Sequence, residues 1–264
     1  METSISLVVG VVLLTVSLWT ANKSSAKTQS LPICFKTSHQ SGTITAINSD
    51  LTLTLDHTHK IKLANIAPAP SLQQQDLAKH WKNRHVHIYP ATLKPDRHNR
   101  LLAHIIRYEN TTPLWLQADV VKKGHAQVSV SPSTRSCFAM LRKLEQQART
   151  KQTGGWAKGQ GLQVYHANNL EQLNQIQQGQ FVIVKGKVMA IGRSGQNTFI
   201  NFSKEWRKDF TVLIKTRLLH RKTLIWPTID NLPGKEIEVR GWLDHWNGPM
   251  LRLEVPEQLR EQSP

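Results

Sequence analysis

Short runs in which apolar and polar residues alternate, each bounded by turn residues, fill two separate parts of the chain. The first part opens with SGTITAINSDLTLTLDHTHKIKLANI (41–66), where Leu51, Leu53 and Leu55 alternate with threonines. Alternate residues of a strand point to opposite faces, so each run can bury one face only. Several such strands in a short stretch favour a small closed barrel, which buries that face and leaves no free sheet edge.

The same part of the chain continues with further strand and helix patterns. They predict strands over 85–89 and 100–108, short helices over 71–81 and 113–123, and a longer amphipathic helix over 136–153. Five strands with helices between them predict an OB-type five-stranded barrel. We assign this first domain to residues 34–160.

A second set of strand patterns begins at Phe181. The runs are FVIVKGKVMAIG (181–192), NTFINFS (197–203), FTVLIKT (210–216) and EIEVRGWLDHWNGPMLRLEVP (236–256), with turns expected at Gly192, Gly195, Pro233–Gly234 and Asn247–Gly248. Five short strands in about 75 residues predict a second, OB-fold-like barrel over 179–264. The Gln- and Asn-rich stretch 161–178 is expected to connect the two domains, and the fold class is mainly β with α (α+β).

The chain begins with an apolar run over residues 5–19, which is short for a membrane span and suits a signal peptide. Small residues up to Ala26 offer a cleavage site. Glu2 precedes the run and Lys23 follows it, which is the wrong charge order for a typical signal. We therefore expect residues 1–33 to form a signal peptide or a retained membrane anchor with a linker. The protein would be exported, either periplasmic or anchored and facing the periplasm or the extracellular side.

The chain has two cysteines, Cys34 and Cys137, both in the first domain. In an exported protein two cysteines favour a disulfide. Two buried free thiols are the alternative for a cytosolic chain.

The charge is strongly basic, with 34 Lys and Arg against 18 Asp and Glu, a formal net charge of +16. Such an excess favours polyanionic partners: nucleic acid, anionic lipid or an acidic glycan. Charge alone does not indicate catalysis or sequence specificity.

Over about 42–157 the first domain resembles the thermonuclease (micrococcal-nuclease-like) family. The resemblance rests on TAINSDLTLTL, IKLANIAPAP, DRHNRLLAHII and ARTKQTGGWA, in this order. In the third stretch Asp96, Arg97 and Arg100 fit the family's D-x-x-G-R-x-L-A run. The resemblance implies a barrel fold and calcium-dependent hydrolysis of phosphodiesters, which needs two metal-binding carboxylates, a Glu and two arginines.

Most of these family positions are changed in this chain. One metal acid is kept as Asp50, the first arginine is replaced by Lys62 and the second is kept as Arg100. The second metal acid is replaced by Ala67 and the Glu by Pro70. Hard cations need several oxygen ligands, and loss of a general base costs about 10²–10⁴-fold in rate. We therefore predict a degenerate nuclease with no metal cofactor, in which Arg100 serves either as a phosphate contact or as a structural residue.

The second domain resembles nucleic-acid-binding OB domains that follow some thermonuclease-like domains, through the run G-K-x-x-x-V-R-G-W over 234–242 and Asn247-Gly248-Pro249. Such domains bind single strands by aromatic stacking in a basic groove. We assign Phe199, Phe210 and Trp242 to the core. The candidate nucleic-acid contacts of both domains are Lys62, Arg97, Arg100, Lys204, Trp206, Arg207, Lys208 and Trp246, with Lys215 and Arg217 as further candidates. Packing between the barrels is the alternative role for the tryptophans.

These observations lead to three hypotheses on function. The first is a module that binds nucleic acid or another polyanion without efficient cleavage. The second is a residual metal-dependent nuclease that uses Asp50, Lys62 and Arg100. The third is a structural or protein-interaction module of the cell envelope, attached to the membrane through residues 5–19 if that run is retained.

Overall fold

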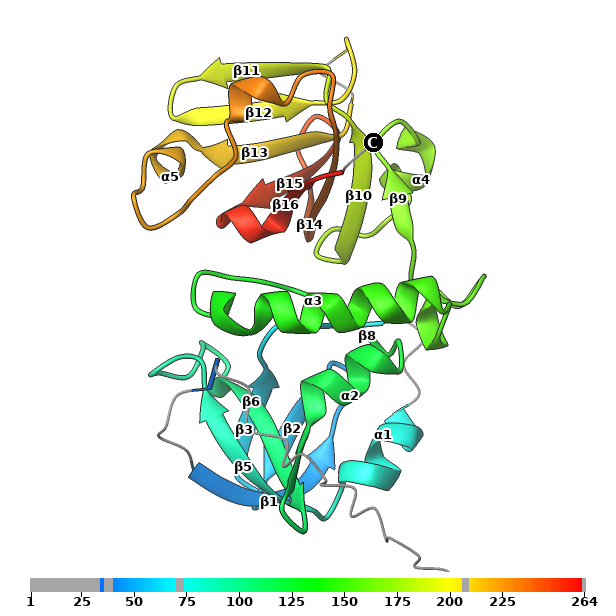
Figure 1. Ribbon diagram of the computed structural model, residues 1–264, viewed down its shortest axis with the longest axis vertical. Coiled ribbons are helices and arrows are strands. Elements are labelled where there is room, and N and C mark those ends of the chain that lie inside the picture. The colour runs from blue at the N-terminus through cyan, green and yellow to red at the C-terminus, as the bar shows by residue number, and fades with distance from the viewer. Residues whose placement is uncertain (1–33, 36–39, 70–73, 206–208, 263–264) are drawn as a thin grey trace, which may run out of the picture.

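The computed structural model describes residues 34–35, 40–69, 74–205 and 209–262. The expected signal or anchor segment lies outside these residues, as do Pro70, Trp206, Arg207 and Lys208. Two β domains lie one above the other, with a long helix between them (Figure 1). Within the described ranges, no helix is long and apolar enough to cross a membrane.

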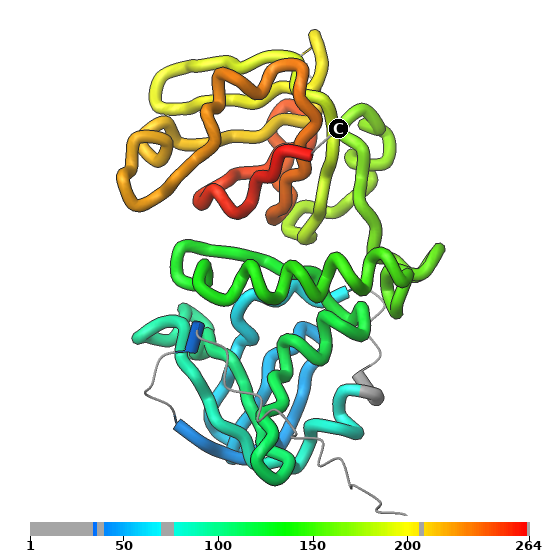
Figure 2. The backbone as a smooth tube through the Cα atoms, in the orientation of Figure 1, coloured from blue at the N-terminus to red at the C-terminus, as the bar shows by residue number. Residues whose placement is uncertain are grey.

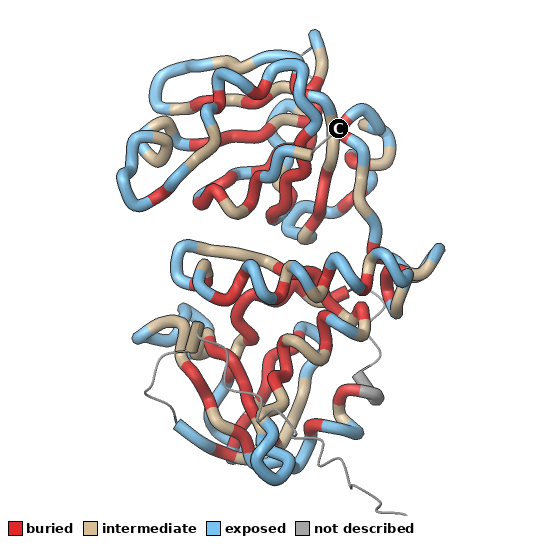
Figure 3. The backbone as a smooth tube through the Cα atoms, in the orientation of Figure 1, coloured by how far each residue is buried: buried red, intermediate tan, exposed pale blue. Residues whose placement is uncertain are grey.

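The first domain is a closed five-stranded barrel, as predicted. Its strands are β1 (Gln40–Ile47), β2 (Thr52–Leu55), β3 (His59–Leu63), β5 (His85–Pro90) and β6 (Arg100–Glu109). They follow the order β1-β2-β3-β6-β5, and β5 pairs with β1 to close the ring. The closing pair β3–β6 is parallel, and Ile61 and Leu63 of β3 point into the core. Alternation along each strand therefore fills one enclosed core, and buried residues recur along the strands of the barrel in Figure 3.

Three helices and three short strands complete this domain. They are β4 (Ile66–Pro68), α1 (Gln74–Trp81), β7 (Thr112–Trp115), α2 (Leu116–Lys122), β8 (Ala126–Val128) and α3 (Arg135–Thr150). The helix predicted from residue 113 begins only at Leu116, because Thr112–Trp115 pairs with β6 as a strand. Gly124 has a φ of 68° after α2, the left-handed conformation that glycine adopts without strain.

The second domain has the same strand order as the first. Its main strands are β10 (Phe181–Lys187), β11 (Ala190–Ser194), β12 (Asn197–Asn201), β13 (Thr211–Lys215), β14 (Glu236–His245) and β15 (Pro249–Leu253). The hydrogen-bonded path β11-β12-β13-β15-β14-β10 includes one parallel pair, β13–β15. Only Val188 and Met189 separate β10 from β11, and their N–H groups donate to Lys235 and Asn201. The two strands thus form one bent strand that brings the path back on itself, as in an OB-fold.

Two of the residues predicted to lie in the core of this domain do not lie there. Both are on strands, and their side chains point out of the barrel. Phe199 lies between the buried Thr198 and Ile200, so its ring points out of the barrel and is half-buried. Trp242 likewise points outward on β14 and is 49% exposed. Phe210 is fully buried, as expected. Gly192, expected at a turn, lies inside β11 instead.

The stretch 161–178 carries structure of its own. It contains β9 (Val164–His166), which pairs in parallel with β10, and α4 (Leu170–Asn174). Leu173 and Ile176 are buried in the core of the second domain. The remaining elements are α5 (Thr216–Leu219), β16 (Leu259–Glu261) and 3-10 turns at Gly154–Trp156, Ile229–Asn231 and Pro256–Gln258.

A buried ion cluster joins the two domains. Arg240 of β14 is 1% exposed and points toward α3 and β8 of the first domain. Its Nη1 lies 2.9 Å from Glu145 Oε2 and donates a hydrogen bond to Val128 O, while Nη2 lies 3.0 Å from Glu238 Oε1. Burial alone would lower the pKa of Arg240, but the two carboxylates raise it. The guanidinium is therefore charged, and both of its terminal nitrogens have partners at the boundary.

Further contacts extend this boundary. From α3, Arg142 and Arg149 each place a guanidinium nitrogen 3.0 Å from a Glu238 oxygen. A small apolar cluster beside them contains Ala148 and Trp156 of the first domain and Ile183 of β10. The continuous course of the backbone through α3 into the second domain is seen in Figure 2. The two domains are therefore joined along α3 by ion pairs and by apolar packing.

The structure contains the predicted disulfide, Cys34–Cys137, which confirms the pairing. It ties the segment before β1 to the first turn of α3, across a sequence separation of 103 residues. Closing a loop of this length stabilises the native state by about 4–5 kcal/mol in the chain-entropy model. Next to it, Phe35 stacks on Tyr89 and contacts the rings of His104 and Trp115.

Replacing Arg240 by alanine is expected to lower the free energy of unfolding by about 3–5 kcal/mol, because Glu145 and Glu238 lose a buried partner. Urea denaturation measures this change. Arg193→Ala is the matched control, since its ion pair with Asp230 is exposed on both sides and such pairs contribute about 0–1 kcal/mol. Equal losses in the two variants would contradict a structural role for the buried cluster.

His104 gives a pH-dependent prediction, since burial lowers its pKa to about 3. Below the unfolded-state pKa of about 6.5, the unfolded chain binds a proton that the native state excludes, so stability falls by about 1.4 kcal/mol per pH unit down to the native pKa. Between pH 7 and pH 5 the wild type should lose about 2 kcal/mol more than His104→Phe. Urea denaturation at both pH values tests this, and parallel losses would refute it.

Candidate nucleic-acid interface

Asp50 is the residue that the resemblance assigns to a metal site, and its oxygens are already engaged. It lies in the turn between β1 and β2, where Oδ1 accepts from the Thr52 N–H at 2.9 Å and Oδ2 from the Thr52 hydroxyl at 2.8 Å. Arg100 Nη1 lies 3.4 Å from the same Oδ2. The carboxylate therefore serves as a turn cap and as a weak partner of an arginine.

Arg100 begins β6 and is held mainly by Asp96. Its Nε and Nη2 donate to Asp96 Oδ2 at 3.0 and 2.8 Å. Partial desolvation would raise the pKa of Asp96, but the hydrogen bonds from Arg100 and from the His98 backbone, with the charge of Arg100, lower it to about 2. Two carboxylates thus compensate the Arg100 charge, an arrangement that favours the structural alternative for this residue.

Lys62 lies on the outer face of the first barrel, on β3 between β2 and β6. Its backbone is in register with Thr52 on one side and Leu102 on the other. Lys60 lies on the same face and is in register with Arg100. Neither lysine has an ion-pair partner among the described residues. The exposed Arg97 donates from Nε to the ring of His98 at 3.1 Å.

The residues present do not fit a calcium ion. Ala67, which the resemblance places at the second metal-acid position, is 1% exposed and is paired within β4 to Gln127 of β8. Its methyl group supplies no ligand, which leaves Asp50 alone, whereas Ca²⁺ takes six to eight oxygens. Within the described residues, no group of three or more His, Cys, Asp or Glu side chains is placed to hold a metal.

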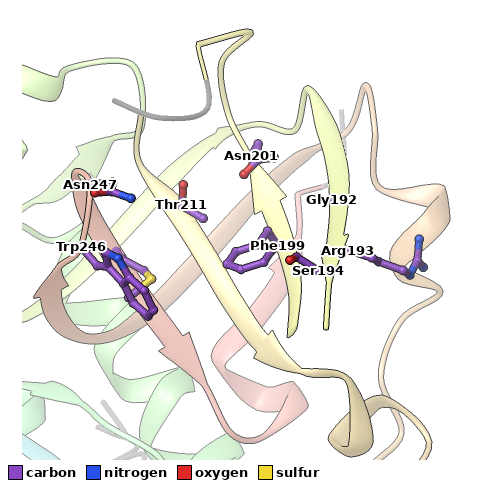
Figure 4. A pocket seen from close by; sticks show the side chains of 9 residues that line it. Gly192, Arg193, Ser194, Phe199, Asn201, Thr211, Trp246 and Asn247 are labelled. Carbon is purple, nitrogen blue, oxygen red and sulfur yellow. The ribbon is translucent and has the colours of Figure 1, made fainter. Parts of the chain in front are cut away.

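A groove crosses the outer face of the second barrel, with a volume of about 440 Å³. Figure 4 shows Phe199 of β12 and Trp246 of the β14–β15 turn within it. Trp246 is 60% exposed, which confirms its expected exposure. Asn201 and Thr211 add an amide and a hydroxyl to the lining. Aromatic faces beside hydrogen-bonding groups are suited to a planar, polar ligand.

Gly192 explains why the Phe199 ring is accessible. The two residues are register partners on β11 and β12, and a Cβ added to Gly192 would lie 3.8 Å from the Phe199 Cβ. A larger side chain at this position would extend over the ring. The glycine that the sequence suggested as a turn thus leaves an aromatic face open.

The two arginines beside the groove are both paired with carboxylates. Arg193 Nη2 lies 2.6 Å from Asp230, and Arg252 Nε lies 3.0 Å from Asp244. The Arg252 guanidinium also lies over the Trp246 ring, 5.8 Å from its centroid, which helps to fix the indole. The sequence did not indicate Arg252 as a neighbour of Trp246, because the two residues meet only when the chain turns back from β14 into β15.

Comparison with known families places one match on this chain. Residues 69–158 match the family described as Staphylococcal nuclease homologue. The matched range contains Asp96 and Arg100 and begins after Asp50, Lys62 and Ala67. No curated protein matches the chain.

Calcium is expected to leave the stability of the protein unchanged. If a site with a Kd of about 1 mM existed, about 10 mM CaCl₂ would add about 1.4 kcal/mol to the free energy of unfolding. Urea denaturation in CaCl₂, compared with NaCl at equal ionic strength, should show no such difference. A stabilisation specific to Ca²⁺ would show that other residues complete a metal site.

Proposed function

We propose that this protein, whose first domain is thermonuclease-like, binds single-stranded nucleic acid and does not hydrolyse it efficiently. The observation that carries the binding proposal is the groove on the second barrel, where Phe199 and Trp246 present aromatic faces. Stacking of one base on an aromatic ring contributes about 1–3 kcal/mol and depends little on sequence. Stacking in the groove requires unpaired bases, which a single strand provides.

Inefficient hydrolysis is proposed from the state of the family's catalytic positions. Asp50 is engaged by Thr52 and Arg100, and Ala67 is buried without a ligand atom. Lys62 keeps a positive charge, but it lacks the planar fork with which an arginine binds phosphate through two hydrogen bonds. The first domain thereby keeps cations, but one engaged carboxylate is too few to hold a metal and activate water.

The charge of the protein supports a polyanionic ligand. The net charge is +16, and Lys60 and Lys62 are available on the outer face of the first barrel. Neutralisation of phosphates by such residues makes affinity strongly dependent on salt. We further propose that the protein acts after export, in the periplasm or at its membrane, which the Cys34–Cys137 disulfide favours.

Binding to a fluorescent single-stranded oligonucleotide, measured by anisotropy, tests the proposal. The wild type should bind with an affinity that falls steeply as salt rises. Trp246→Ala should weaken binding by about 5- to 150-fold, the loss of one stacked base. Trp242→Ala is the matched control, since Trp242 is similarly exposed but packs on Phe181 outside the groove, and it should have less than about a twofold effect.

The same oligonucleotide, incubated with the wild type and Ca²⁺ or Mg²⁺, should remain intact. Metal-dependent cleavage that disappears in Arg100→Ala would overturn the non-hydrolytic proposal in favour of a residual nuclease. Absence of binding at low salt would overturn the nucleic-acid proposal itself.

A further inference from the structure

A second cavity, of about 580 Å³, lies where the two domains meet. We call it the basic cleft. It is lined by Arg135 at the start of α3, by Lys215, Arg217 and Arg221 of β13, α5 and the following turn, and by Arg252 and Glu254 at the end of β15. Five cations and one carboxylate therefore face one space, and the cations come from both domains.

The cations of the basic cleft differ in how far they are already compensated. Arg135 lies 2.7 Å from Glu257, and Arg252 pairs with Asp244. Lys215 donates to the neutral amide of Asn197 at 2.9 Å, which does not offset a positive charge as a carboxylate would. Arg217 and Arg221 are exposed, and neither side chain has a hydrogen-bond or ion-pair partner in the described part of the chain.

The basic cleft continues from the groove along the same two strands. Thr211 of β13 and Met250 of β15 are register partners in the groove, and Lys215 and Arg252 lie further along these strands in the cleft. Four residues of a strand span about 13 Å, so the two sites are neighbours. Arg252 links the two sites, because it lines the cleft and its guanidinium lies over the ring of Trp246, which lines the groove.

We propose that the basic cleft binds the phosphates of a single-stranded nucleic acid whose bases stack in the groove, an inference that rests on the function proposed above. Free guanidinium groups bind phosphate through two parallel hydrogen bonds, and Arg217 and Arg221 are the free ones here. Aromatic faces at one end and uncompensated cations at the other match the two repeating parts of such a chain.

The position of the basic cleft gives the first domain a role in binding. Arg135 enters the cleft from α3, and its Nη1 donates to Thr223 O of the second domain at 3.1 Å. The ion cluster around Arg240 fixes α3 against β14. The cleft is thus assembled by the domain boundary, and a bound strand would be guided from the second barrel toward the first.

The experiment compares a cleft variant, Arg217→Ala/Arg221→Ala, with a control variant, Lys79→Ala/Lys82→Ala. The control removes the same charge from exposed positions at the C-terminal end of α1, a helix that contacts β1 of the first barrel (Figure 1). Affinity for a single-stranded oligonucleotide is measured by anisotropy over a series of salt concentrations. The cleft variant should bind about tenfold or more weakly, and its salt slope should be shallower by about 1.4, or about 0.7 for each phosphate that the variant no longer neutralises. The control should stay within about twofold of the wild type.

An abasic oligomer of the same length separates the two sites. The cleft variant should lose affinity for it as it does for the oligonucleotide, whereas Trp246→Ala should have no effect, because no base is present to stack. Thermal unfolding checks that the cleft variant is folded. Its midpoint should equal that of the wild type, because the two side chains removed are exposed and have no partners among the described residues.

Two results would overturn the assignment in different ways. If the wild type binds the oligonucleotide and the cleft variant matches the Lys79/Lys82 control, the cleft is not the phosphate site and the proposed function stands. If the wild type binds vesicles containing anionic lipid but no oligonucleotide, both proposals fail and the basic cleft belongs to a membrane surface.

Discussion

The arrangement of the molecule depends on the charge of Arg240. A guanidinium taken out of water is stable only when its charge and its N–H groups are matched. Here the partners come from β14 itself, from α3 and from the backbone of β8. Since these partners belong to both domains, the cluster favours the docking geometry seen here. The basic cleft, whose lining also comes from both domains, is a product of that geometry.

Much of the fold could be predicted from local pattern, because strand alternation and helix periodicity depend on neighbours in sequence. The same pattern does not say which face of a strand points inward when both faces carry large side chains, and the core assignments of Phe199 and Trp242 are wrong for this reason. The Arg240 cluster could not be predicted from β14 alone. One signal was present: Glu145 occupies the apolar face of the helix that also carries Leu141 and Ala148.

The candidate site was predicted unevenly. Motif comparison located Asp50, Lys62 and Arg100 on one part of the barrel, because the family motif specifies order and spacing. It could not show that Asp96 and Asp50 compensate Arg100, since those contacts depend on side-chain geometry. The motifs of the second domain indicated Trp246, Lys215 and Arg217 as separate candidates, but not the groove or the basic cleft that they line. Both sites arise where β13 and β15, distant in sequence, are brought side by side by the parallel pairing that closes the barrel.

The apolar cluster of Ala148, Trp156 and Ile183 has a consequence for any shorter form of the chain. A fragment that ends before β10 lacks both Ile183 and Arg240. Ala148 and Trp156 then lose an apolar neighbour, and the buried carboxylate of Glu145 loses its cationic partner. An unpaired buried charge and newly exposed apolar surface both lower stability. The surface of the first domain is therefore completed only by the last third of the chain.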